Sequence, residues 1–117
     1  GKRVLDIGGN IGAFAYTALE NGAVKVDSFE PDASNIKMYK RQGLDSTLYE
    51  YAVTDRDGKA KFYLNSGKNK GMHTLRETRG REFVEVKTIS FEKVLKKVKP
   101  QILKIDIEGG EYGSDTG

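Results

Sequence analysis

The residues with the clearest capacity for chemistry lie near the start of the chain, in the segment Asp6-Ile7-Gly8-Gly9-Asn10-Ile11-Gly12. An acid ends a short apolar run, and a glycine-rich turn then leads into a segment with helical periodicity. Glycine lets the backbone approach a ligand closely and adopt positive φ values. The N–H groups of a helix N-terminus beyond such a turn favour a carboxylate or a phosphate. The segment therefore predicts a site for a nucleoside-type ligand, with binding residues Asp6, Gly8, Gly9, Asn10 and Gly12.

A second acid, Glu30, ends the next apolar run and bears on what the glycine turn binds. For the glycines alone, a tight strand-to-helix turn without a ligand is the alternative. A carboxylate at the end of the second strand of a doubly wound sheet can accept hydrogen bonds from both ribose hydroxyls, although solvated carboxylates at strand ends are common. Because Glu30 accompanies the glycine turn, we favour a ribose. Pro31 would then form a rigid wall near the base, and Ala52 and Val53 would line its other side unless they are core residues.

Charged residues alternate along the last apolar segment, at Lys104, Asp106 and Glu108. Acids at the carboxyl end of a parallel strand lie at the mouth of the ligand crevice, where catalytic groups are common. We therefore take Asp106 and Glu108 as candidate catalytic residues, and Asp106 also as a cofactor contact. Lys104 is at least as well explained by a structural ion pair with an acid of a neighbouring strand, such as Asp6, because an unpaired buried charge is costly.

His73 is the single histidine of the chain and lies in a basic, glycine-rich stretch. Imidazole changes its charge near neutral pH, which suits a general base. His73 is therefore a further catalytic candidate, and a solvated surface residue is the alternative.

The elements that must position these residues follow from the spacing of apolar side chains. Apolar runs predict strands at residues 3–7, 24–30 and 47–53. Between them, helical spacing predicts one helix from Ile11 to the Asn21-Gly22 stop and another from an Asp32 N-cap to Gly43. The order β-α-β-α-β implies a parallel, right-handed, doubly wound sheet.

The apolar spacing changes in the second half of the chain. After the turn signal Asp57-Gly58, alternation over residues 60–64 predicts a hairpin strand that folds back from the third strand. Residues 65–81 predict a mobile loop, and residues 83–89 another strand. Ser90 is a candidate cap for a short helix, and residues 101–107 predict the fourth parallel strand. We expect an α/β fold with a doubly wound, mostly parallel sheet and an antiparallel hairpin insertion.

Composition limits the class of protein. The 117 residues suit one domain, and 37% hydrophobic residues with a mean hydropathy of -0.59 support a modest core. A net charge of +3 without a basic and aromatic stripe argues against a specific nucleic-acid binder. The lack of cysteine and the single histidine argue against a metal site. No apolar run reaches the length of a membrane span and no secretory signal is visible, so a cytoplasmic protein is expected.

Five segments occur together in a characteristic order. They are Asp6-Ile7-Gly8-Gly9-Asn10-Ile11-Gly12, Phe29-Glu30-Pro31, Asp57-Gly58, Thr88-Ile89-Ser90-Phe91 and Leu103-Lys104-Ile105-Asp106-Ile107-Glu108-Gly109-Gly110-Glu111. With these segments, which span nearly the whole chain, the sequence resembles the FkbM-type S-adenosylmethionine-dependent methyltransferases. Many methyltransferases share the first segment, and the last one is far more specific.

The resemblance implies a Rossmann-like class I methyltransferase fold and S-adenosylmethionine as cofactor. It implies that the glycine loop holds the methionine moiety, that Glu30 holds the ribose, and that residues 52–54 lie at the adenine edge. Asp106 and Glu108 would lie by the methyl group and the acceptor. Family members commonly methylate hydroxyls of sugars, polyketides and related metabolites, so a small-molecule or glycan acceptor is implied. An alcohol acceptor benefits from a base, for which Asp106, Glu108 or His73 are candidates.

The resemblance also implies a sheet of seven strands, whereas the chain ends soon after the fourth. We therefore expect one domain over residues 1–117 that is incomplete at its C-terminus, with residues 113–117 as a disordered tail. The chain also begins at Gly1 rather than Met, as an excised piece would. The fourth strand would be an exposed apolar edge at Ile105 and Ile107, open to self-association.

Two other classes of function stay open. A truncated, non-catalytic cofactor-binding or interaction module would use the glycine loop or the open edge without turnover. An NAD-dependent oxidoreductase is disfavoured, because the glycines at positions 8, 9 and 12 depart from the G-x-G-x-x-G spacing of dinucleotide-binding loops.

Overall fold

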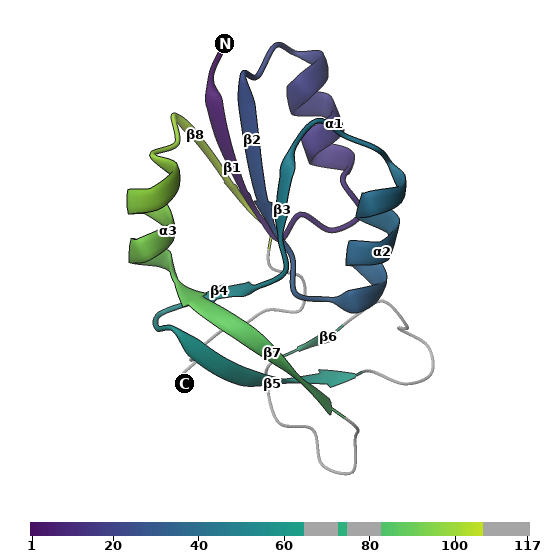
Figure 1. The fold of residues 1–117 in the computed structure, drawn as a ribbon, viewed down its shortest axis with the longest axis vertical. Coiled ribbons are helices and arrows are strands. Elements are labelled where there is room, and N and C mark those ends of the chain that lie inside the picture. Colours follow the sequence, from purple (N-terminus) through teal and green to yellow (C-terminus); the bar gives the residue numbers. More distant parts are fainter. Residues whose placement is uncertain (65–72, 75–82, 107–117) are drawn as a thin grey trace.

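Within residues 1–64, 73–74 and 83–106, the parts of the chain that the computed structural model describes, the fold has two sheets and three helices (Figure 1). The first sheet contains β1 (Arg3–Ile7), β2 (Lys25–Phe29), β3 (Thr47–Tyr49) and β8 (Ile102–Ile105). Its strands lie in the order β3-β2-β1-β8, and every neighbouring pair is parallel. The predicted parallel sheet is therefore confirmed.

Helices cover both faces of this sheet. Figure 1 shows α1 (Ala13–Glu20) and α2 (Ala33–Arg41) on one side and α3 (Phe91–Val98) on the other. Successive residues of a strand point to opposite faces. On the α1 and α2 side, Val4 and Val26 of the strands pack with Ala15 and Tyr39 of the helices. The doubly wound α/β architecture predicted from the order of elements is confirmed.

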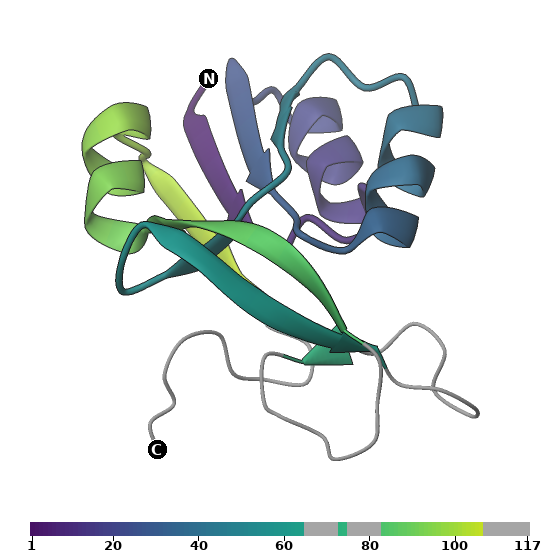
Figure 2. The same cartoon turned by 60° about the horizontal axis from the view of Figure 1, so that its bottom comes forward.

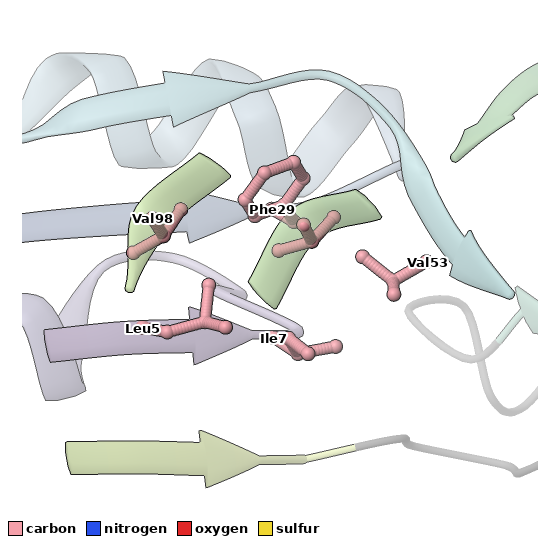
Figure 3. Close-up of a cluster of buried hydrophobic side chains, with 6 residues drawn as sticks. Leu5, Ile7, Phe29, Val53 and Val98 are labelled. Atoms are coloured by element: carbon pink, nitrogen blue, oxygen red, sulfur yellow. The ribbon is translucent and has the colours of Figure 1, made fainter. Parts of the chain in front are cut away.

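The other face of the sheet holds a second apolar cluster. Leu5, Ile7 and Phe29 point from the strands toward Val98 of α3 and Val53, as Figure 3 shows. Burial of apolar surface of this kind is the main favourable term in folding. The two clusters together fix β1 and β2 at the centre of the sheet, so their carboxyl ends are held by packing on both faces.

The helix starts follow their capping residues. Asp32 accepts a hydrogen bond from the Asn35 N–H (2.9 Å), and Ser90 accepts one from the Lys93 N–H (3.1 Å), which confirms both predicted N-caps. The first helix begins at Ala13 and not at Ile11 as predicted. Gly12 precedes it in the left-handed conformation, which interrupts helical geometry, and Ile11 lies outside the helix and is 40% exposed.

The second sheet contains β4 (Ala52–Thr54), β5 (Gly58–Leu64), β6 (His73–Thr74) and β7 (Phe83–Ser90), in the order β4-β7-β5-β6. β4 pairs with β7 in parallel, and β5 pairs antiparallel with both β7 and β6. In Figures 1 and 2 this sheet lies beyond the ends at which β1 and β2 stop. It therefore lies on the side of the molecule where the predicted site residues emerge.

Two predictions about this region are wrong. The single strand predicted over residues 47–53 is divided into β3 and β4, which belong to different sheets. β3 ends beside β2, where Tyr49 stacks on Phe29 with ring centroids 4.4 Å apart, and the chain then leaves the sheet. The predicted hairpin with the third strand is also wrong, because β5 pairs with the long strand β7 instead. β7 pairs with β5 along one of its edges and with β4 along the opposite edge.

Some predictions lie outside the described residues. These are the tail at residues 113–117, Ile107 at the end of the fourth strand, and most of the loop at residues 65–81. In the part of the chain that is described, no helix has the length and apolar character needed to cross a membrane.

Candidate cofactor site

The loop between β1 and α1 depends on glycine at two positions. Gly8 has a φ of 85°, and a Cβ atom there would lie 2.0 Å from the backbone oxygen of Asp106. Gly12 has a φ of 98° and precedes the first turn of α1, which has no side-chain cap. Asn10, between them, is also left-handed, with a φ of 57°. The loop therefore turns tightly over the ends of β1 and β8 and leads into uncapped helix N–H groups.

The loop is tied to the end of β2 by its backbone. The N–H groups of Gly8 and Gly9 both donate to the Phe29 carbonyl, at 2.8 and 3.0 Å. On the other side of β1, the Asp106 N–H donates to the Ile7 carbonyl at 2.8 Å. The carboxyl ends of three parallel strands thus meet at the glycine loop, as expected for a ligand crevice in a doubly wound sheet.

A row of polar side chains crosses the sheet directly beneath this loop. Asp6 of β1 lies in register with Ser28 of β2 on one side and Lys104 of β8 on the other. The Ser28 hydroxyl donates to Asp6 Oδ2 at 3.3 Å, and Lys104 Nζ lies 3.8 Å from Asp6 Oδ1. Lys104 also lies 3.4 Å from the Asp106 carboxylate. The ion-pair explanation of Lys104 is confirmed.

Asp6 is fully buried, and its Oδ1 has no hydrogen-bond partner among the described residues. Burial raises the pKa of this carboxyl, and the charge of Lys104 opposes the rise. Leaving a buried polar atom without a hydrogen bond costs about 1–3 kcal/mol. Such atoms in native structures call for a physical explanation, and a functional site is one.

Glu30 links the glycine loop to the start of α2. Its side chain is only 4% exposed. Oε1 accepts from the Asn10 N–H (2.7 Å), while Oε2 accepts from the Asp32 N–H (2.9 Å) and from Asn35 Nδ2 (3.3 Å). Burial raises the pKa of Glu30, and the hydrogen bonds to the two backbone N–H groups and to Asn35 oppose the rise. The alternative of a solvated strand-end carboxylate is therefore wrong.

The remaining predicted cofactor residues flank this acid. Pro31 is buried directly after Glu30. Ala52 and Val53 are buried in β4, and the Val53 side chain packs in the apolar cluster with Leu5 and Ile7 (Figure 3). The side chain of Val53 is therefore part of the apolar core, which was the alternative to its lining the base of the cofactor.

Of the three predicted catalytic residues, the structure places one beside the glycine loop. Asp106 follows β8, and its side chain is 46% exposed beside Lys104. His73 lies in β6, where its backbone pairs with Leu64 of the second sheet. Glu108 lies outside the described residues. The structure thus brings Asp106 to the same edge as Asp6 and the glycine loop.

Three residues of this region were missed from the sequence. The Tyr39 hydroxyl donates to Ser28 Oγ at 2.8 Å, which continues the polar row from Asp6 to α2. Asn35 donates to Glu30, as described above. A serine inside the apolar run of β2 was the available signal for Ser28. The roles of Tyr39 and Asn35 depend on how α2 packs on the sheet, which spacing alone does not give.

A hollow of about 600 Å³ lies elsewhere, between α1 and the start of β1. Val4, Phe14, Ala18 and Ile102 are among the residues that line it. Its wall is mainly apolar and contains neither Glu30 nor the glycine loop. The hollow is therefore separate from the candidate cofactor site.

Comparison with known proteins bears on this site. The family model described as "Methyltransferase FkbM domain" matches residues 6–113, which is nearly the whole chain. No match is found among curated proteins. One solved structure, a proposed S-adenosylmethionine-dependent methyltransferase from Listeria monocytogenes, is 14% identical, with a TM-score of 0.43 over 84% of this chain and 72% of that chain. On the match of the family model, the chain belongs to the FkbM methyltransferase family.

Proposed function

We propose that this methyltransferase domain binds S-adenosylmethionine over the carboxyl ends of β1 and β2 and methylates a hydroxyl oxygen of a sugar or another small metabolite. The observation that carries the proposal is the buried Asp6 Oδ1, without a hydrogen-bond partner among the described residues, beneath a left-handed glycine loop. Lys104 Nζ lies 3.8 Å from this oxygen, beyond hydrogen-bond reach, so Oδ1 keeps an acceptor position for an N–H or O–H donor of a ligand.

The other groups of the site fit the remaining parts of this cofactor. The uncapped N-terminus of α1 suits the carboxylate of a methionine moiety. The Glu30 carboxylate lies at the end of β2, where an acid can accept hydrogen bonds from ribose hydroxyls. The glycine loop, the start of α1 and the end of β2 therefore present groups suited to the methionine and ribose parts of the cofactor.

The bound cofactor would supply an electrophilic methyl group, so the main task of the protein is to position the acceptor. Asp106 is the described acid best placed to take a proton from an acceptor hydroxyl, because it is half-exposed at the same edge. Its contact with Lys104 holds the carboxylate beside the loop. Glu108 and His73 stay candidates for the same role.

A binding or interaction module without turnover is the second candidate function. It is favoured by the apolar side chains of β8, where Ile102 and Leu103 are each 42% exposed and Ile105 is 51% exposed. Such an edge suits pairing with another strand.

Calorimetry followed by a transfer assay tests the proposal. S-adenosylhomocysteine should bind the wild type, and NAD should not. Glu30→Gln should weaken the binding of S-adenosylhomocysteine by at least about tenfold. The reason is that the NH₂ group of glutamine would face the N–H donors that hold the Glu30 carboxylate. Glu50→Gln, at an exposed pair with Lys40, is the matched control and should bind like the wild type.

In the second stage, methyl transfer from labelled S-adenosylmethionine is measured over a panel of hydroxylated acceptors. Asp106→Asn should lower the rate about 100-fold while binding S-adenosylhomocysteine. No binding of S-adenosylhomocysteine by the wild type would reject the cofactor. Undiminished transfer with undiminished cofactor affinity in Asp106→Asn would reject Asp106 as the base.

A further inference from the structure

Glu30 is held by donors from two separate elements. One is the Asn10 N–H of the glycine loop, and the others are the Asp32 N–H and Asn35 Nδ2 at the start of α2. A carboxylate has about four acceptor positions, and within the described part of the chain three are used. Oε2 accepts two of these bonds and Oε1 one, so the remaining position is on Oε1, the oxygen that also accepts from the glycine loop.

Asn35 is the side-chain donor of this set, and its own position is fixed independently of Glu30. Its backbone N–H donates to Asp32 Oδ2 at 2.9 Å, which is the N-cap bond of α2. Removing the side-chain amide of Asn35 therefore leaves the cap of the helix in place. The neighbouring Ser34 hydroxyl also donates to Asp32 Oδ2, at 3.1 Å, and among the described residues it is not a donor to Glu30.

The charge state of Glu30 decides what it can offer to a ligand. Desolvation of this buried side chain favours the neutral acid, whereas hydrogen bonds donated to the carboxylate favour the charged form. A protonated carboxyl has one oxygen that donates, so it is a poorer acceptor for hydroxyl groups. Each donor that holds Glu30 therefore also preserves its ability to accept.

We propose that Asn35 is a positioning residue for ribose recognition: by donating to Oε2 it holds the Glu30 carboxylate charged and turns the free acceptor position of Oε1 toward a ribose hydroxyl. This inference rests on the proposed function of the site. It assigns to Asn35 an effect on ligand affinity that passes entirely through Glu30.

The test is calorimetry of S-adenosylhomocysteine with the wild type, Asn35→Ala, Asn35→Asp and Ser34→Ala, from acidic to neutral pH. At neutral pH, Asn35→Ala should bind about tenfold more weakly, the loss expected for a hydrogen bond to a charged group. The pH at which affinity falls on acidification should move upward in Asn35→Ala. It should move further in Asn35→Asp, because the new carboxylate would add to the charge of Asp32, which already raises the pKa of Glu30. Ser34→Ala should match the wild type.

A second measurement needs no ligand. The carboxyl carbon of Glu30 is followed by NMR through a pH titration, and its midpoint should rise from the wild type to Asn35→Ala to Asn35→Asp. If the wild type binds and Asn35→Ala keeps the same affinity and pH profile, the inference is wrong while the proposed function stands. If Ser34→Ala loses as much affinity as Asn35→Ala, the role of Asn35 is structural. If the wild type does not bind, both fail.

Discussion

Two carboxyl groups of the site are buried in a way that opposes folding at neutral pH. Asp6 and Glu30 are 0% and 4% exposed, and desolvation is the largest cause of the raised pKa of each. For both groups, the folded state binds its proton more tightly than the unfolded chain. Below the ordinary carboxyl pKa both states are protonated and burial costs little. As the pH rises through the folded-state pKa, the fold must hold a buried charge, and stability is lost.

Asp6→Asn should therefore be more stable than the wild type at neutral pH, and its advantage should shrink as the pH falls toward the ordinary pKa of an aspartate. The amide keeps the shape of the side chain, can still accept from Ser28, and carries no charge to desolvate. Urea unfolding at acidic and neutral pH measures the difference. Asp45→Asn, at an exposed position, is the control and should show no comparable pH dependence. A variant that loses most stability at neutral pH would show that the Lys104 pair outweighs desolvation.

At the scale of elements, the glycine loop and β8 are fitted to each other. Gly8 and Gly22 have nearly the same φ values, 85° and 90°, so an added Cβ is strained by backbone conformation to a similar degree at both. Their surroundings differ. A Cβ on Gly8 would lie 2.0 Å from the Asp106 backbone oxygen, whereas one on Gly22 would meet nothing within 4 Å. The contact at Gly8 therefore arises because the glycine loop packs closely against the end of β8.

Gly22→Ala should cost about 1 kcal/mol of unfolding free energy, the cost of a left-handed residue with a side chain. Gly8→Ala should cost more than about 3 kcal/mol, because backbone must also move away from the new Cβ. Chemical denaturation measures both variants. Equal costs would mean that the loop and β8 separate without penalty, and would contradict the close contact.

Element types were predictable from the sequence, but their pairing partners were less so. Apolar runs and the two cap residues, Asp32 and Ser90, predicted the three helices and the four strands of the parallel sheet in their order. The short strand β6 was missed, because it lies within residues predicted as a loop. The division of residues 47–53 between two sheets was missed, because β4 finds its partner in β7, far along the chain. In the site, the glycine positions could be predicted from residue type. The bonds of Glu30 to Asn10 and Asn35 could not, because they depend on how α2 is placed against the loop.

At the scale of the whole molecule, β8 is an edge strand of the parallel sheet in the part of the chain that the structure describes. Parallel strands are usually covered and buried, and an exposed apolar edge offers unpaired N–H and C=O groups to another strand. Ile102, Leu103 and Ile105 are between 42% and 51% exposed, and Ile102 also lines the apolar hollow beside α1. Apolar surface therefore continues from the edge strand to one face of the sheet. A second copy of the chain presents the same strand and the same surface.

The protein should therefore self-associate through β8, and sedimentation velocity should show an average mass that rises with concentration. Ile105→Lys should keep the protein monomeric, because a charged side chain on an edge strand opposes pairing with another edge. Val24→Lys is the matched control: Val24 is 67% exposed directly before β2, which β1 separates from β8, and its replacement should leave association unchanged. Both variants add one positive charge, so a general effect of charge on association would appear equally in each. A wild type that stays monomeric at every concentration, or two lysine variants with equal effects, would show that β8 is not the contact.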